Sequence, residues 1–176
     1  MAWDVLANYC IMSPHYFLMQ QAYEDYKQNT SPAGLTPKNQ CAVRMSLALG
    51  RCGFSLDAFP DQRRVISKQH LPVPYVQGAK ELADYLQTMW GAPQVFRRNL
   101  NTVAQTLNNQ KGIVYFNNCF HRADDPEGTR QGDHIDLWNG THYYNQVYHL
   151  RAGMEDRLSS GPLFTSSDSV WFFRLY

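Results

Sequence analysis

Charged residues are scarce in this chain of 176 residues, and none of its charged stretches is a basic run. Charged side chains make up 18% of the sequence, and the formal net charge at pH 7 is +1. Charge-driven binding to nucleic acid or to an anionic membrane needs a clustered positive surface. The composition therefore predicts neither a nucleic-acid partner nor a membrane partner.

Long apolar stretches are also missing. No segment approaches the roughly 18 apolar residues that a membrane-spanning helix needs. The first residues, Met1 to Val5, lack the basic region followed by an apolar stretch that marks a secretory signal. We therefore expect a protein that is made in the cytoplasm without a signal peptide.

The sequence has only four cysteines, Cys10, Cys41, Cys52 and Cys119. They are too sparse for a disulfide framework, and if Cys41 is a nucleophile, at most one disulfide remains. We expect the other three to be reduced and packed, with a disulfide forming only in an oxidising compartment. With 44% hydrophobic residues, a chain of this length can bury the core of one domain, so we expect a single domain over residues 1–176.

Cys41 lies where a helix is expected to begin. Thr36-Pro37 and Asn39 are helix-start signals, and Gly50 is a natural stop. The unpaired amide groups of a first helical turn favour a thiolate, and they can also hydrogen-bond an oxyanion that forms on an attacked carbonyl carbon. The alternative is that Cys41 is simply a small buried hydrophobic residue.

A hairpin is predicted around His134. Polar and apolar residues alternate before Asn139-Gly140, a pair typical of a two-residue type I′ turn. In that register Trp138 faces Thr141, and His134 faces Asn145 across the strands. Cys41, His134 and Asn145 would then form the Cys-His-Asn arrangement of thiol proteases.

Two motifs, residues 39–46 (NQCAVRMS) and residues 134–140 (HIDLWNG), together resemble the fourth family of type VI secretion amidase effectors. The resemblance extends over roughly residues 35–148 and includes a helix near 81–91 and a strand at 112–116. It implies an α+β, papain-like (NlpC/P60-type) fold, in which the nucleophile begins a helix packed on an antiparallel sheet. It also implies a cysteine endopeptidase that cleaves the γ-D-glutamyl to meso-diaminopimelate bond of peptidoglycan stem peptides.

The resemblance leaves the third catalytic residue open. The family has an aspartate about one hairpin length after the histidine, where this chain has Asn145. Asp136 is the alternative, because residues two apart on a strand share a face. We expect substrate contacts from four residues that flank the catalytic ones: Arg44, Asn39, Gln40 and Trp138. Arg44 lies one turn beyond Cys41, where it either serves the chemistry or holds the helix in place.

The family also implies partners and a place of action. The partners are a specific immunity protein and the type VI secretion apparatus, and the substrate lies in the periplasm of target bacteria. No cofactor and no metal are implied.

The sequence also allows three other functions. A zinc site from Cys119, His121, His134 and His142 lacks the usual ligand spacing. A papain-like hydrolase or acyltransferase acting on another amide would use the same catalytic residues. A non-catalytic binding module on this scaffold would be expected to lack Cys41 or His134, and both are present.

The remaining pattern predicts helices first and antiparallel strands later. Aromatic residues after Ser13-Pro14 predict a helix with a core face, and residues 78–91 predict another. A short strand near Val95 and a helix at 102–107 follow. Further strands are expected at 111–118, 147–150 and 170–176, with a charged loop at 121–132 that is either specificity-determining or a solvated tip.

Overall fold

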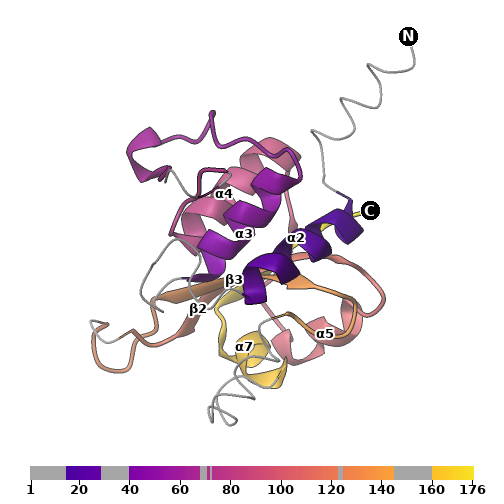
Figure 1. Ribbon diagram of the computed structural model, residues 1–176. Helices are drawn as coiled ribbons and strands as arrows, with labels where there is room; N and C mark the ends of the chain where they lie inside the picture. The colour runs from indigo at the N-terminus through magenta and orange to yellow at the C-terminus, as the bar shows by residue number, and fades with distance from the viewer. Residues whose placement is uncertain (1–14, 29–39, 68–70, 72, 123–124, 145–159) are drawn as a thin grey trace. The chain divides into compact units, whose positions relative to one another are not determined.

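The computed structural model describes residues 15–28, 40–67, 71, 73–122, 125–144 and 160–176 (Figure 1). The backbone alone is described for residues 25–28 and 160–162. The chain forms two compact units, Met1–Ala92 with Leu175–Tyr176, and Pro93–Arg174. The expectation of one domain over residues 1–176 stays a prediction.

The first unit is helical. Its elements are α2 (Tyr16–Gln28), α3 (Gln40–Arg51), η2 (Gln62–Arg64) and α4 (Ala79–Trp90). Helix α3 packs against both α2 and α4. The predicted ends of α4 are confirmed, since Gly78 is its N-cap and Gly91 ends it with a φ of 90°. The predicted helix at Cys41 is confirmed as α3, but it runs through Gly50, the predicted stop, and ends at Arg51.

Helix α2 buries an aromatic face, as predicted, through Tyr16, Met19 and Tyr23. Phe17 was expected on that face, but it is 57% exposed. The reason is geometric, because Phe17 is rotated by about 100° from Tyr16 around the helix. None of the described helices is long and apolar enough to cross a membrane.

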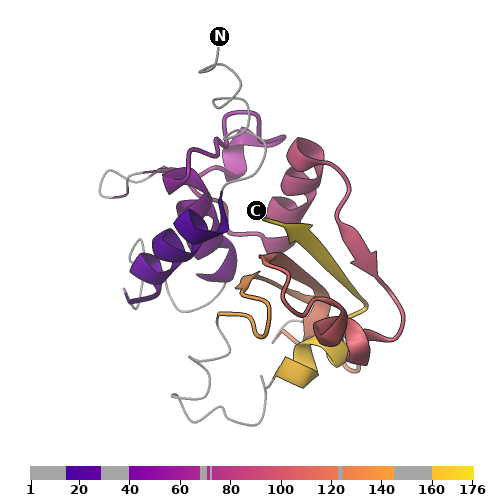
Figure 2. The ribbon, with the colours of Figure 1, turned by 90° about the vertical axis from the view of Figure 1, so that its right-hand side faces the viewer.

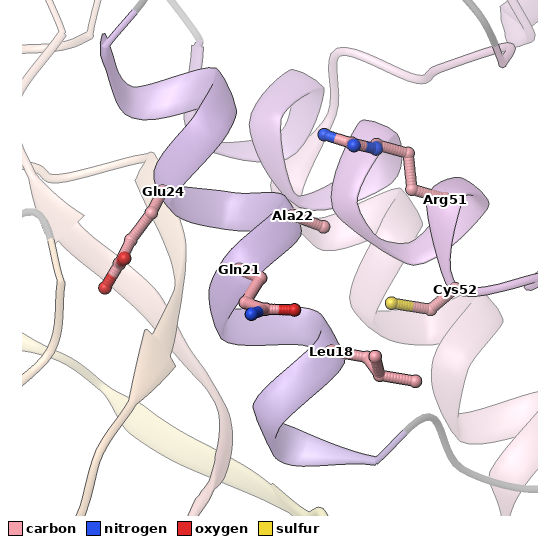
Figure 3. Close-up of a pocket in the computed structure, with 6 residues that line it drawn as sticks. All are labelled: Leu18, Gln21, Ala22, Glu24, Arg51 and Cys52. Carbon is pink, nitrogen blue, oxygen red and sulfur yellow. The ribbon is translucent and has the colours of Figure 1, made fainter.

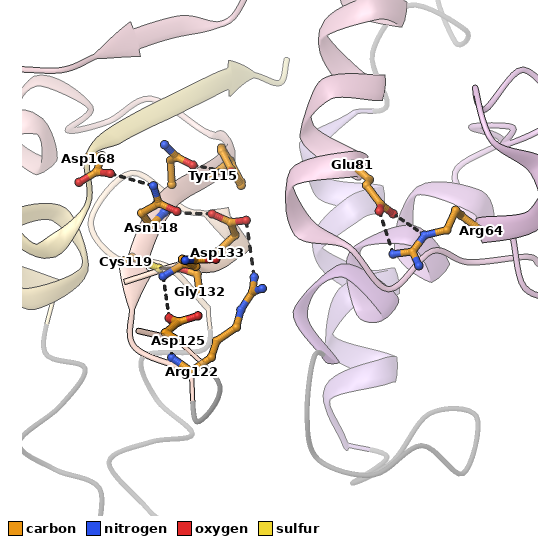
Figure 4. A network of polar contacts seen from close by, with 12 residues as sticks. Arg64, Glu81, Tyr115, Asn118, Cys119, Arg122, Asp125, Gly132, Asp133 and Asp168 are labelled. Atoms are coloured by element: carbon orange, nitrogen blue, oxygen red, sulfur yellow. Dashed lines mark hydrogen bonds and ion pairs between the residues drawn. The ribbon is translucent and has the colours of Figure 1, made fainter. Parts of the chain in front are cut away.

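The irregular segment between α3 and α4 is fixed at two points. Ile66 and Tyr75 form an isolated antiparallel bridge. Arg64 also forms an ion pair with Glu81 of α4, with an N–O distance of 2.8 Å (Figure 4). The segment is thus irregular, as expected, and it is joined to the helical core.

The second unit is a four-stranded antiparallel sheet in the order β1-β4-β2-β3 (Figure 2). The strands are β1 (Gln94–Phe96), β2 (Gly112–Phe120), β3 (Gly132–Trp138) and β4 (Ser169–Arg174). The predicted strands at 111–118 and 170–176 and the strand near Val95 are confirmed. The strand expected at 147–150 lies outside the described residues.

Short helices cover one face of this sheet. They are η3 (Leu100–Thr102), α5 (Val103–Thr106) and α7 (Ser160–Ser166). Their apolar side chains share a core with alternate residues of the strands: Leu107, Val114, Phe116, Trp138, Phe164 and Phe172. Helix α7 was not predicted, because Gly161-Pro162 is ordinarily a turn pair; here the proline falls in the first helical turn, where it is tolerated.

Strand β2 carries an irregularity just beyond the position that faces His134. The register with β3 shifts between Phe116 and Phe120. Asn118 has a φ of 51°, donates its backbone N–H to Asp133 at 3.0 Å and donates its side-chain amide to Asp168 at 2.8 Å (Figure 4). Bulges of this kind commonly redirect side chains beside functional sites.

Candidate active site

Cys41 is the second residue of α3 and is partly exposed. The backbone N–H groups of a first helical turn have no acceptor within the helix, so they can stabilise negative charge on the sulfur or on a substrate oxygen. No acidic residue occupies this turn of α3. The capping role expected of Asn39 lies outside the described residues, so it is untested.

Two residues around Cys41 contact each other within the same helix. The Arg44 Nη2 donates a hydrogen bond of 2.7 Å to the side-chain oxygen of Gln40. Gln40 is buried, with an exposed fraction of 8%. One function of Arg44 is therefore to hold the side chain that immediately precedes Cys41.

His134 lies on β3, where it pairs with Phe116 of β2. Its Nε2 is 3.4 Å from Oδ2 of Asp136, and the side chains are 14% and 0% exposed. The other carboxylate oxygen of Asp136 accepts the backbone N–H of Leu137 at 2.8 Å. The structure thus brings together an imidazole and a buried, fixed carboxylate on one strand.

The hairpin after β3 differs from the predicted one. Trp138 bridges Tyr143 rather than Thr141, and the Tyr144 N–H donates to the Leu137 carbonyl at 3.0 Å. Gly140 has a φ of 103°, while Asn139 is not among the described non-glycine residues with positive φ. The turn is therefore centred on residues 140–141, and the predicted type I′ turn at Asn139-Gly140 and its register are wrong.

Asn139 explains this turn. Its side-chain oxygen accepts the backbone N–H groups of Thr141 and His142, each at 2.9 Å. An asparagine that bonds the backbone two and three residues on acts as a turn initiator, not as a central residue. The pairing is therefore shifted by two residues from the predicted one, and Asn145 lies outside the described residues.

This register also brings in a residue that the sequence analysis did not single out. Tyr143 is fully buried, and its ring centroid lies 6.3 Å from that of His134 and 5.5 Å from that of Phe116. Burial, and then the negative charge of Asp136, raise the pKa of the Tyr143 hydroxyl. The sequence does contain a signal for this residue: side chains alternate between the faces of a strand, and the alternation places Tyr143, after the turn, on the same face as Asp136.

Trp138 was expected to contact substrate, but it is a core residue. Its side chain is fully buried, and its indole Nε1 donates to the Leu107 carbonyl at 3.0 Å. The ring is therefore occupied in packing, and it offers no surface to a ligand in this conformation.

The residues of the zinc alternative have other contacts. The Cys119 thiol lies 3.4 Å from the Gly132 carbonyl oxygen, and His142 contacts the Asn139 and Thr141 side chains of the turn. Within the part of the chain that the structure describes, no group of three His, Cys, Asp or Glu residues is arranged to hold a metal ion.

A groove of about 450 Å³ lies elsewhere, between α2 and the end of α3 (Figure 3). Its lining residues are Leu18, Gln21, Ala22, Glu24, Arg51 and Cys52. Cys52 is half-buried, and burial raises the pKa of its thiol, an effect that Arg51 partly offsets. Cys52 directly follows the last residue of α3 and is eleven residues after Cys41, which is roughly 16 Å along the helix axis, so the groove is remote from the candidate nucleophile.

Solved structures with a similar fold are effectors of bacterial type VI secretion. The Tae4–Tai4 effector-immunity complex from Enterobacter cloacae has a TM-score of 0.63 and 17% identity, over 94% of this chain and 100% of that chain. Tae4 from Salmonella typhimurium, in complex with the immunity protein Tai4 from Enterobacter cloacae, has a TM-score of 0.61 and 18% identity, over 93% and 99%. These likenesses show the mixed α and β fold with its antiparallel sheet.

No curated protein matches the chain. The family model of type VI secretion system (T6SS) amidase effector protein 4, Tae4, matches residues 38–173, a range that contains both Cys41 and His134. The match spans most of the sequence, and it confirms the resemblance drawn from the two motifs. The chain belongs to the Tae4 family of type VI secretion amidase effectors.

Proposed function

We propose that this amidase effector is a cysteine endopeptidase of papain-like, NlpC/P60 type, which cleaves the γ-D-glutamyl to meso-diaminopimelate bond of peptidoglycan stem peptides. One observation carries the proposal: a buried carboxylate, Asp136, lies 3.4 Å from the imidazole of His134. A thiol in the first turn of α3, that of Cys41, supplies the nucleophile. Membership of an amidase family supports hydrolysis of an amide.

The mechanism follows from these groups. His134 takes the proton from the Cys41 thiol, and the thiolate attacks the amide carbonyl carbon. First-turn N–H groups of α3 stabilise the oxyanion that forms. His134 then protonates the leaving amine, and water, activated by the same imidazole, releases the acyl group from the sulfur.

Asp136 is our choice as the residue that orients His134. A carboxylate on the imidazole fixes the ring and stabilises the imidazolium that forms during proton transfer. The contact of 3.4 Å with the His134 Nε2 supports this role. Asn145 stays a competing candidate, and Asn39, Gln40 and Arg44 stay candidates for binding substrate near the sulfur.

The related structures suggest a partner. Tae4 proteins from Salmonella typhimurium and Enterobacter cloacae were solved with the immunity protein Tai4. We infer that this chain likewise has a cognate immunity protein, is exported by the type VI apparatus, and acts in the periplasm of the target cell.

The test is mass spectrometry of muropeptides after digestion of purified sacculi. Cleavage should yield fragments ending in D-glutamate and fragments beginning with meso-diaminopimelate. Cys41→Ala and His134→Ala should each abolish them while staying folded, and Cys52→Ala serves as the matched control that retains activity. A thiol alkylator should inactivate the enzyme, and a chelator should not.

Three outcomes would contradict the proposal. Lysis by a folded Cys41→Ala protein would remove the nucleophile from the mechanism. Loss of activity with the chelator, but not with the alkylator, would favour metal-assisted hydrolysis. Products in which the acyl group is transferred to another amine would favour the acyltransferase alternative.

A further inference from the structure

Two aromatic rings border the imidazole of His134. Phe116 stacks on the imidazole at a centroid distance of 6.2 Å and an interplanar angle of 29°. Tyr143 meets the imidazole edge-on, at 6.3 Å and 66°, and it also contacts Phe116 at 5.5 Å. Two large buried side chains thus border the ring on two sides, and a bordered ring has few rotamers open to it.

The turn fixes Tyr143 in this place. Tyr143 bridges Trp138, the last residue of β3. Its ring also packs against Phe164 of α7, at 6.5 Å. Contacts with the sheet and with α7 therefore fix the position of the Tyr143 ring, and a fixed ring can restrict the orientation of the imidazole beside it.

The carboxylate of Asp136 completes the arrangement. It is fully buried, and its negative charge acts on the Tyr143 hydroxyl, whose pKa is raised by burial and by that charge. The hydroxyl is therefore neutral at pH 7. A neutral phenol beside a buried carboxylate adds no competing negative charge to the His134–Asp136 pair.

We propose that Tyr143 is a positioning residue of the active site, whose ring holds the imidazole of His134 in the plane that faces Asp136. This inference rests on the proposed function, because it assigns Tyr143 a part in the chemistry of His134. A positioning role and a purely structural role predict different kinetics. Loss of positioning lowers kcat, the rate of the chemical step, more than it changes KM.

The test compares Tyr143→Phe, which keeps the ring, with Tyr143→Leu, which removes it. We expect Tyr143→Leu to lower kcat at least tenfold with KM within about twofold, and Tyr143→Phe to retain kcat within about threefold. Tyr143→Met replaces Tyr143→Leu if the latter unfolds at the assay temperature. Rates are taken per folded molecule.

Tyr115→Leu is the matched control. Tyr115 is equally buried and adjoins Phe116 on β2, but it faces the other side of the sheet, where its ring lies 5.3 Å from Trp171. Its replacement should lower stability while leaving kcat within about twofold. An equal loss of kcat in Tyr115→Leu would mean that general loosening of the sheet explains the effect.

A second readout does not need an active enzyme. In a Cys41→Ala background, the imidazole C–H resonances of His134 should stay sharp in Tyr143→Phe and should broaden in Tyr143→Leu. The proposal is overturned if Tyr143→Leu keeps its kcat and sharp resonances, or if Tyr143→Phe loses as much kcat as Tyr143→Leu. Absence of amidase products from the unmutated enzyme would instead reject the proposed function, and the resonances would still test Tyr143.

Discussion

The Nε2 atom of His134 lies 3.4 Å from the Oδ2 atom of Asp136, two residues farther along β3. Residues at this spacing share a face of the strand, so the contact needs no partner from another element. The second oxygen of Asp136 is fixed by the N–H of Leu137. The carboxylate is thus immobilised by the strand that carries the histidine, which suits it to orient the ring.

Asp136→Asn is the direct test of that role. The amide preserves shape but lacks the negative charge that stabilises the imidazolium, so we expect kcat to fall by roughly 10²- to 10⁴-fold. Thermal unfolding should show a folded protein. Steady-state kinetics on a soluble stem-peptide substrate measures the loss.

The competing residue gives the control. Asn145→Ala should lower kcat less than Asp136→Asn does if Asp136 orients the ring. The reverse order would assign the orienting role to Asn145, as the family pattern of a residue one hairpin length after the histidine suggests.

The sequence predicts those parts of the site that depend on interactions between residues close together in the chain. That His134 and Asp136 share a face follows from strand parity alone, which is a local property. That a helix begins at Cys41 follows from local start signals, whereas the stop signal at Gly50 was overridden and α3 ends at Arg51. These two predictions are confirmed by β3 and α3.

The hairpin register was not predictable in the same way. Asn139-Gly140 favours a type I′ turn when the asparagine side chain makes no hydrogen bond to the turn. Here the Asn139 side-chain oxygen accepts two backbone N–H groups, and the centre of the turn moves by one residue. The bulge at Asn118 depends on Asp133 and on Asp168, which is 50 residues away. Such long-range bonds leave no periodic trace in a sequence.

The start of β3 gives a stability prediction. A Cβ on Gly132 would lie 2.3 Å from the Phe120 ring and 2.6 Å from the Phe120 carbonyl oxygen. The backbone atom cannot move aside without disturbing the strand pair that carries His134, so Gly132→Ala should destabilise by about 1–3 kcal/mol. At roughly 2–4 °C per kcal/mol, the Tm should fall measurably by calorimetry.

Gln131→Ala is the control for this change, since the Gln131 side chain is exposed and only its backbone N–H is used. Its Tm should stay within about a degree of the unmutated value. An unchanged Tm for Gly132→Ala would show that the Phe120 ring and backbone adapt freely.

Asp125 gives a prediction about pH. Its Oδ2 accepts the N–H groups of Arg122 at 2.8 Å and Gln131 at 2.7 Å, closing the loop between β2 and β3 (Figure 4). Desolvation alone would raise the pKa of this carboxyl, but those two hydrogen bonds and the nearby His121 and Arg122 charges bring it below the ordinary 3.8.

The sign follows from linkage. A carboxyl with a lowered folded-state pKa stabilises the fold above its unfolded-state pKa, and the contribution is lost as the pH falls through the folded-state value. Asp125→Asn should therefore lower the Tm at pH 7, and the difference should shrink below about pH 4. Glu127→Gln, a change to an exposed carboxyl in the same loop, should leave the Tm at pH 7 unchanged. Parallel Tm curves for Asp125→Asn and the unmutated protein would refute the assignment.

Arg44 gives the last prediction. Its guanidinium donates to the Gln40 side chain at 2.7 Å, across one turn of the helix that carries Cys41. Lysine has a single charged amine in place of a planar group with several donors, so Arg44→Lys should keep the charge but weaken this contact. We expect a Tm lower by a few degrees, since hydrogen bonds to charged groups contribute about 1.5–3 kcal/mol, and a kcat/KM of the folded enzyme within about twofold of the unmutated value.

Gln40→Ala should reproduce the Tm loss, and the double variant should add little to it, because both changes remove the same bond. A tenfold loss of kcat/KM in Arg44→Lys at an unchanged Tm would instead place the guanidinium on the substrate.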